Sequence, residues 1–297
     1  MLKSAAPPVE YLFPETVEAA CRLKADRGAE GFFIAGGTDL LLFLEQQQVR
    51  PRALIDVTRI PDLLQLRVQA NRVTIGAGVT FSRMLASGPL CAAAPSLAHA
   101  LRTIGGVQVR NVATLVGNVV NASPAADSMP PLHVLRADVG IVGPQGKRRV
   151  PVTDFVLGVR QTVLSPGELV TDIGFDLRGP GWHDAFEKLG LRQAMAIAVA
   201  SVCLAVRIED HTVQEARLAL GAVGPTVFQV QEAADALLGT HLDDDSIEQA
   251  SHLASAAARP IDDVRASAGY RRRAVAGLIR RALLKLRRQM ESDLADA

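Results

Sequence analysis

The sequence has few cysteines and no long apolar run. Cys21, Cys91 and Cys203 are its only cysteines, and no two of them have zinc-finger or iron–sulfur spacing. Three cysteines cannot all pair within one chain, which favours a reducing compartment. No stretch approaches the roughly 18–20 apolar residues that span a bilayer, and residues 1–10 lack the apolar segment of a signal peptide. We therefore expect a soluble, cytoplasmic protein without a membrane span.

The sequence also lacks an excess of charge. It has 32 lysines and arginines against 31 aspartates and glutamates, a net charge of +1. This balance argues against a nucleic-acid partner or an anionic membrane surface. With 297 residues, 48% of them hydrophobic, the chain can bury the core of two domains or three small lobes.

A recognisable catalytic set is missing as well. The six histidines show no HxxxH or HExxH spacing, and no GxSxG nucleophile motif is present. Single acids such as Asp56, Asp127 and Asp172 have no partner evident from the sequence. We therefore predict no catalytic residue and no metal ligand, as in a protein whose chemistry belongs to a bound cofactor.

Periodicity predicts a mixed α and β chain. The predicted strands are residues 9–14, 32–35, 53–57, 73–80, a hairpin of 134–142 with 147–150, 168–175, 195–208 and 213–222. The predicted helices are residues 15–24 (Thr16 as N-cap, Gly28 at the end), 38–44, 81–86, 97–104, 230–238, 246–258 and 270–290. Residues 178–181 are the best linker candidate.

Two glycine-containing segments stand out, residues 33–40 and 114–127. The second is rich in small, hydroxyl and amide side chains, and its composition predicts a poor helix that offers backbone N–H groups to a ligand. In the first, a strand runs through Gly36 and Gly37 into a helix N-terminus, which favours anions. Gly-Gly-Thr by itself more often marks a tight turn between a strand and a helix, with Thr38 or Asp39 as the N-cap. Neither segment is a Walker or Rossmann loop. Together they indicate a phosphate-bearing cofactor.

The residues of both segments match a known family. Residues 34–40 with 113–118 and 123–127 resemble the FAD-binding medium subunit of the molybdenum hydroxylases, which include xanthine dehydrogenase and carbon monoxide dehydrogenase. Residues 108–111, 150–155 and 260–272 match further blocks. The resemblance covers nearly the whole chain.

The resemblance implies an α+β fold. Residues 1–177 should form a two-lobed FAD-binding domain of the PCMH or vanillyl-alcohol-oxidase type, with lobes of about 1–58 and 59–177. Residues 182–290 should form a small α+β domain of the CO dehydrogenase flavoprotein C-terminal type.

The resemblance also implies the site. Residues 35–40 and 114–118 would bind the FAD pyrophosphate, Ile104 and Lys188 would lie near the flavin, and Asp127 would bind a polar part of FAD with Asn121 close by. The full set of expected cofactor-binding residues is Ile34, Ala35, Gly36, Gly37, Thr38, Asp39, Leu40, Ile104, Val109, Thr114, Gly117, Asn118, Asn121, Asp127 and Lys188. Two positions depart from the family pattern: Val116 stands at a usual glycine and Ala196 at a usual aspartate. If Val116 blocks close approach of the cofactor, replacing it with glycine should tighten FAD binding.

Members of this length are electron-transfer subunits. A small [2Fe–2S] subunit and a large molybdopterin subunit are the expected partners, and the electron acceptor would be NAD, oxygen or another compound. The alternatives are a standalone FAD-dependent oxidoreductase and a non-catalytic binding or scaffold protein. The basic residues of 270–290 fit a solvated face better than a partner-docking surface.

Overall fold

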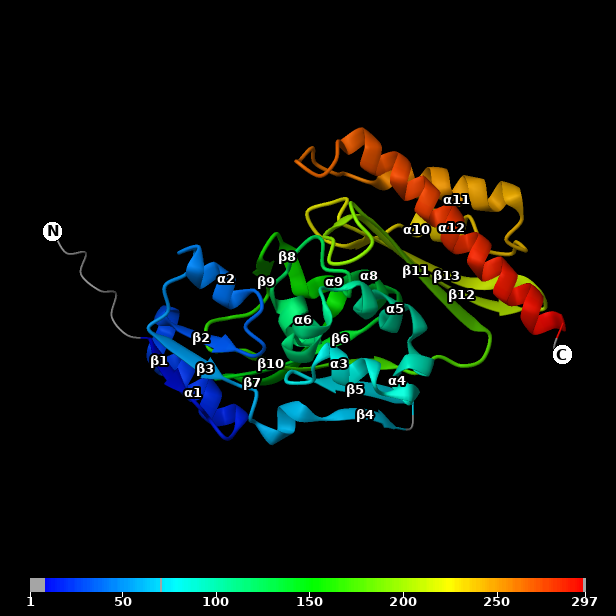
Figure 1. Cartoon of the computed structure of the whole chain (residues 1–297). Coiled ribbons are helices and arrows are strands. Elements are labelled where there is room, and N and C mark those ends of the chain that lie inside the picture. Colours follow the sequence, from blue (N-terminus) through cyan, green and yellow to red (C-terminus); the bar gives the residue numbers. More distant parts are fainter. Residues whose placement is uncertain (1–8, 70, 296–297) are drawn as a thin grey trace.

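The N-terminal lobe is built on a small parallel sheet. The computed structural model describes residues 9–69 and 71–295, so residues 1–8, part of the segment expected not to be a signal peptide, lie outside it. The strand order is β1-β3-β2, at the left of Figure 1. As predicted, the first helix begins after Thr16, whose side chain accepts a hydrogen bond from the amide of Ala19, and ends at Gly28. The elements are β1 (Glu10–Leu12), α1 (Val17–Arg27), β2 (Gly31–Ile34), α2 (Leu40–Glu45) and β3 (Ala53–Asp56).

The second lobe is a five-stranded antiparallel sheet of order β4-β5-β10-β6-β7. Short helices between β5 and β6 pack over the face of the sheet that carries the main hydrophobic core (Figure 1). Its strands are β4 (Leu66–Gln69), β5 (Arg72–Gly76), β6 (Asp138–Gly143), β7 (Gly146–Pro151) and β10 (Leu169–Asp176). Its helices are α3 (Phe81–Leu85), α4 (Gly88–Ala93), α5 (Pro95–Thr103), α6 (Val107–Val112), α7 (Leu115–Val120), α8 (Met129–Val134) and α9 (Val152–Phe155). The hairpin of β8 (Val156–Gly158) and β9 (Gln161–Thr162) lies beside this sheet.

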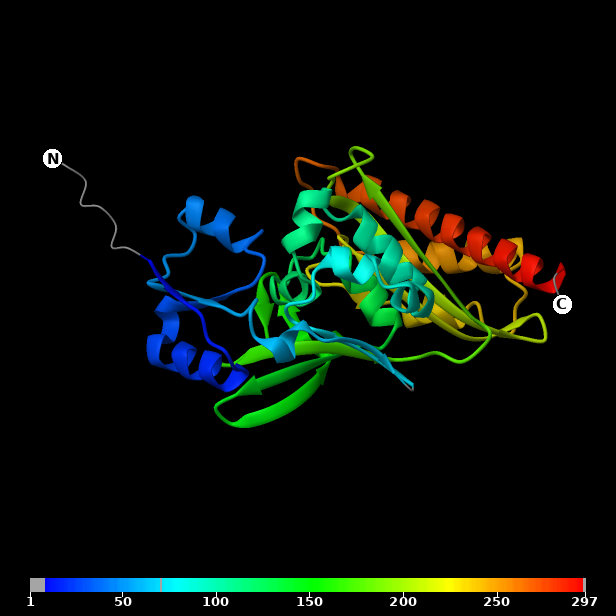
Figure 2. The ribbon, with the colours of Figure 1, turned by 60° about the horizontal axis from the view of Figure 1, so that its bottom comes forward.

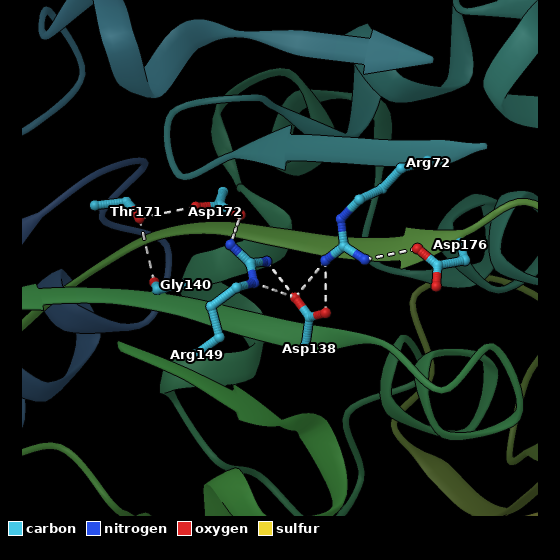
Figure 3. Close-up of polar contacts among 7 residues, drawn as sticks. All are labelled: Arg72, Asp138, Gly140, Arg149, Thr171, Asp172 and Asp176. Atoms are coloured by element: carbon cyan, nitrogen blue, oxygen red, sulfur yellow. Dashed lines mark hydrogen bonds and ion pairs between the residues drawn. The ribbon is translucent and has the colours of Figure 1, made fainter. Parts of the chain in front are cut away.

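The other face of this sheet carries charged side chains (Figure 3). Asp138 accepts hydrogen bonds from both Arg72 and Arg149, and Arg149 also pairs with Asp172 at 2.9 Å. Gly140 leaves room for this network, since a Cβ there would lie 2.3 Å from a carboxylate oxygen of Asp172. Alternation of apolar and polar faces is the expected pattern of an antiparallel sheet with one solvated side.

The C-terminal half forms a four-stranded antiparallel sheet of order β11-β12-β13-β14. Helices α11 and α12 pack together, and α12 crosses β11 and β12, whereas α5 and α8 of the preceding lobe also contact this sheet (Figures 1 and 2). Apolar contacts therefore continue across the junction at residues 177–181, and the predicted domain bounds of 1–177 and 182–290 stay a prediction. The elements are β11 (Trp182–Gly190), β12 (Ala198–Glu209), β13 (Thr212–Gly221), β14 (Phe228–Gln229), α10 (Gln231–Asp235), α11 (Asp244–Ala257) and α12 (Ala268–Ala295).

Only some of the basic residues of α12 form a solvated face. Arg271 is buried and donates to the carbonyl oxygens of Val199 and Ala222 and to the carboxylate of Asp263. Arg280, Arg281 and Arg287 form ion pairs with Glu248, Glu187 and Asp244. Arg271 therefore anchors the segment of residues 260–272 to the sheet.

Several local predictions were wrong. Residues 114–127 were expected to be a poor helix, yet residues 115–120 form α7, because Thr114 caps the helix and its apolar face is buried. The strand predicted from residue 134 begins only at Asp138, since Val134 ends the proline-containing helix α8. Strands β4 and β11 and helices α4 and α6 were not predicted. No helix in the described ranges is long and apolar enough to cross a membrane.

Candidate functional site

A cavity of about 590 Å³ lies where the two N-terminal lobes meet. Its wall is formed by four stretches of chain: residues 32–49 (β2, α2 and their loops), Phe81 at the start of α3, residues 104–121 (from the end of α5 to the end of α7), and Arg160 in the β8–β9 hairpin. Every expected cofactor-binding residue except Asp127 and Lys188 lines it. The lining also includes residues that were not predicted: Phe32, Phe33, Phe43, Val49, Phe81, Gly105, Ala113, Val120 and Arg160. Its size is typical of a site for a small molecule or cofactor.

The β2–α2 loop depends on two glycines. A Cβ on Gly36 would lie 2.0 Å from the carbonyl oxygen of Val112, so only glycine lets this loop touch the end of α6. Gly37 has φ +68°, a left-handed conformation that side chains disfavour. These two positions bring the loop against the second segment and turn the chain into α2.

The same loop presents a row of free amides to the cavity. Within the described chain, none of the backbone N–H groups of residues 35–39 donates a hydrogen bond. Asp39 precedes α2 without a side-chain cap, so it leaves the first N–H groups of that helix unbonded to its carboxylate. Consecutive free amides at a helix N-terminus form a binding site for anions such as phosphates.

The second segment lines the cavity with residues at and near α7. Thr114 is buried and its hydroxyl accepts a hydrogen bond of 3.0 Å from the amide of Gly117. Gly117 is exposed, and Asn118 and Asn121 also line the cavity. Asn118 is itself held by the hydroxyl of Ser128, which donates to its side-chain oxygen at 2.6 Å.

Val116 points away from the cavity. Its side chain is 5% exposed and belongs to the main hydrophobic core, not to the cavity lining. The idea that Val116 obstructs the cofactor is therefore not supported by its position.

Replacing Val116 with glycine should destabilise the protein without tightening FAD binding. We expect a loss of about 2–4 kcal/mol in the free energy of unfolding, because the change leaves a cavity and puts glycine in a helix. Urea unfolding and FAD titration measure the two effects. Val120→Gly is the matched helix control for the unfolding measurement alone, because Val120 is 37% exposed but lines the cavity, and it should cost about 1 kcal/mol. Tighter FAD binding by Val116→Gly would contradict the structure.

The turn after α5 forms another part of the wall. Gly105 has φ +52°, and its carbonyl oxygen and that of Ile104 accept hydrogen bonds from the guanidinium of Arg110, at 2.9 and 3.0 Å. A Cβ at Gly105 would lie 2.9 Å from Val109. Arg110 thus fixes the turn that brings Ile104 to the cavity.

Arg160 lines the cavity and was not predicted from the sequence. Among the lining residues it is the basic one, and Asp39 is the acidic one. Burial raises the pKa of Asp39, while the charge of Arg160 and a hydrogen bond with Asn121 lower it. A single arginine in a loop forms no recognisable sequence pattern, so the sequence analysis did not identify it.

Asp127 and Lys188 lie together outside the cavity lining. Their side chains form an ion pair of 2.5 Å with exposures of 7% and 9%. Burial raises the pKa of Asp127 to about 6, because desolvation outweighs the attraction of Lys188. Lys188 also donates to the carbonyl oxygen of Thr103, next to Ile104, at 3.3 Å. The structure thus joins the two residues to each other, and their contact with a cofactor stays a prediction.

The family is decided by comparison with known proteins. Residues 7–175 match the family described as the FAD binding domain in molybdopterin dehydrogenase, and residues 184–286 match the CO dehydrogenase flavoprotein C-terminal domain. This chain belongs to the FAD-binding medium subunits of the molybdenum hydroxylases. The predicted family, fold class and cofactor type are confirmed.

Individual members of the medium-subunit family are similar over almost their full length. The carbon monoxide dehydrogenase medium chain of Hydrogenophaga pseudoflava is 32% identical over 279 residues, 93% of this chain and 96% of the relative. The glyceraldehyde dehydrogenase medium chain of Sulfolobus acidocaldarius is 32% identical over 84% of this chain and 88% of its own.

Solved structures of the family have the same fold. Carbon monoxide dehydrogenase from Hydrogenophaga pseudoflava superposes with a TM-score of 0.90 at 31% identity, covering 94% of this chain and 96% of that one. Quinoline 2-oxidoreductase from Pseudomonas putida 86 also superposes with a TM-score of 0.90, at 27% identity, covering 95% of this chain and 98% of that one. Chains of different dehydrogenases thus share this medium-subunit fold.

The described residues were also searched for side chains that could bind a metal ion. Within residues 9–69 and 71–295, no group of three or more His, Cys, Asp and Glu side chains could hold a metal ion. The sequence-based expectation of no metal ligand in this chain stays a prediction.

Proposed function

We propose that this chain binds FAD in the cavity between its two N-terminal lobes and acts as the electron-transfer subunit of a molybdenum hydroxylase complex. The observation that carries the proposal is the row of five free amides, residues 35–39, at the wall of a cavity in a medium-subunit fold. Electrons would arrive from [2Fe–2S] clusters of a small subunit that serves a large molybdopterin subunit. They would leave to NAD, oxygen or another acceptor.

The residues present fit FAD. The free amides of residues 35–39 would hold the pyrophosphate, whose charge suits unbonded N–H groups, and the exposed Gly117, without a side chain, would let it approach α7 closely. Apolar residues such as Ile104, Val109 and Phe81 would cover the less polar parts of the cofactor. When bound, FAD supplies the redox chemistry, because a flavin accepts and releases electrons. The chain supplies binding and orientation, and its proposed location is the cytoplasm.

Purification from native cells tests this proposal. The chain should carry non-covalent FAD, seen as a flavin spectrum that is released on denaturation. It should also co-purify with chains that hold [2Fe–2S] clusters and molybdopterin, identified by mass spectrometry and metal analysis. A colourless chain that fails to bind added FAD would refute the cofactor assignment. Turnover of an organic donor by the isolated flavin-loaded chain would instead favour a standalone oxidoreductase.

A further inference from the structure

Arg160 stands at the rim of the cavity and belongs to neither of the two cofactor-binding segments. It lies between β8 and β9, at the tip of their hairpin, with φ +57°. A non-glycine residue in this conformation is strained. Its amide donates a hydrogen bond of 3.0 Å to the carbonyl oxygen of Ala122, just beyond α7. The hairpin tip is therefore tied to the second cofactor-binding segment.

The side chain of Arg160 reaches across to the N-terminal lobe. Its guanidinium carbon lies 4.1 Å from the ring centroid of Phe43, in α2. One nitrogen donates a long hydrogen bond of 3.4 Å to the side chain of Gln48, and its charge acts on Asp39. Arg160 thus bridges the β8–β9 hairpin and α2 at the edge of the cavity.

The guanidinium is only weakly engaged in this position. It has five N–H groups, yet among the described residues it makes one hydrogen bond, to Gln48. It is also exposed, and no ion pair within 4 Å ties it to a carboxylate of the described chain. A guanidinium with spare donors can bind a diphosphate bidentately.

The diphosphate of FAD would need a positive charge close to it in this cavity. Its lining has one basic and one acidic side chain, whereas the diphosphate of FAD brings about two negative charges. The free amides of residues 35–39 supply hydrogen bonds but no net charge. From the proposed FAD site, we infer that Arg160 binds the diphosphate of the cofactor and thereby secures the hairpin and α2 over it.

Three ligands separate this role from a packing role. FAD carries flavin, diphosphate and adenosine, ADP carries the diphosphate and adenosine without flavin, and riboflavin carries the flavin without phosphate. Affinities are measured on the full chain after removal of flavin, by fluorescence for the flavins and calorimetry for ADP. Arg160→Gln removes the charge and keeps a planar polar group on a shorter side chain.

Arg160→Gln should weaken binding of FAD and of ADP about tenfold or more and leave riboflavin unchanged, because a charge-assisted contact to phosphate is lost. The salt dependence of FAD binding should fall in the same variant. Arg160→Lys keeps the charge and should recover part of the affinity. The matched control is Arg59→Gln, since Arg59 also lies over an aromatic ring, that of Phe13 at 4.9 Å, but does not line the cavity.

Two results would overturn the role of Arg160. One is unchanged FAD and ADP affinity in Arg160→Gln, and the other is an equal loss for riboflavin, which would indicate a packing defect. In both cases FAD binding by the wild-type chain would leave the proposed function standing. Failure of the wild-type chain to bind FAD would instead remove the proposed function and the role of Arg160 with it.

Discussion

Replacing Lys188 with methionine is expected to lower the free energy of unfolding by about 3–5 kcal/mol at pH 8, the usual loss when one partner of a buried ion pair is removed. Lys188 and Asp127 are both nine-tenths buried, and their side chains are 2.5 Å apart. The second carboxylate oxygen of Asp127 is buried without a hydrogen-bond partner in the described chain. Without Lys188 this carboxylate would have no compensating charge.

The loss should depend on pH in a definite direction. Burial raises the pKa of Asp127 to about 6, above its value of 3.8 in an unfolded chain. A group whose pKa is raised on folding contributes stability at low pH and loses it as pH rises through the folded value. Removing Lys188 raises the folded pKa of Asp127 further, so the defect of Lys188→Met should grow from pH 5 to pH 8.

Urea unfolding at pH 5 and pH 8 measures this effect. The double variant Asp127→Asn with Lys188→Met should regain most of the stability at pH 8, because no buried charge remains. Lys147→Met, at an exposed position of β7, is the matched control and should change stability little at either pH. An equal defect of Lys188→Met at both pH values would show that the carboxylate of Asp127 is not its cause.

Replacing Gly36 with alanine should weaken FAD binding about 100-fold, the equivalent of roughly 3 kcal/mol. The added Cβ would lie 2.0 Å from the carbonyl oxygen of Val112 and 2.9 Å from the amide nitrogen of Ala113. Both are backbone atoms, so the β2–α2 loop must move away from the second segment. The free amides of residues 35–39 would move with it, and hydrogen bonds to a charged ligand would be lost.

Gly88→Ala provides the matched control for Gly36→Ala. Gly88 begins α4 and has no positive φ, and a Cβ added there would meet no atom within 4 Å. The control should leave FAD affinity unchanged, whereas Gly36→Ala should also lose about 1–3 kcal/mol of stability through overpacking. Isothermal titration with FAD and urea unfolding measure both quantities. Normal FAD affinity in Gly36→Ala would show that close contact of the two segments is not required.

The sequence predicted the two main segments of the cavity wall, but not the individual side-chain contacts around them. The family resemblance identified residues 34–40 and the segment from Thr114, and the structure brings them to one cavity. Sequence alone could not show that Asp127 and Lys188, 61 residues apart, pair with each other outside the lining. Sequence alone also did not identify Arg160, because its place at the cavity depends on the position of the hairpin that carries it.

The incorrect helix prediction has a clear physical reason. Residues 115–120 contain a glycine, an asparagine and three valines, all weak helix formers. In the structure Leu115, Val116 and Val119 are buried in the core, and Thr114 caps the N-terminus. Tertiary burial and the cap outweigh the poor intrinsic propensity, and composition alone cannot predict either of them.

The strand order of the five-stranded sheet bears on how the protein folds during synthesis. The central strand, β10, is the last of the five in the sequence, and β5 and β6 pair with it from either side. A chain emerging from the ribosome therefore exposes two unpaired strand edges until residues 169–176 are available. Such long-range pairing slows folding. The two cofactor-binding segments are synthesised early, but the sheet beneath them is completed only after β10 has been made.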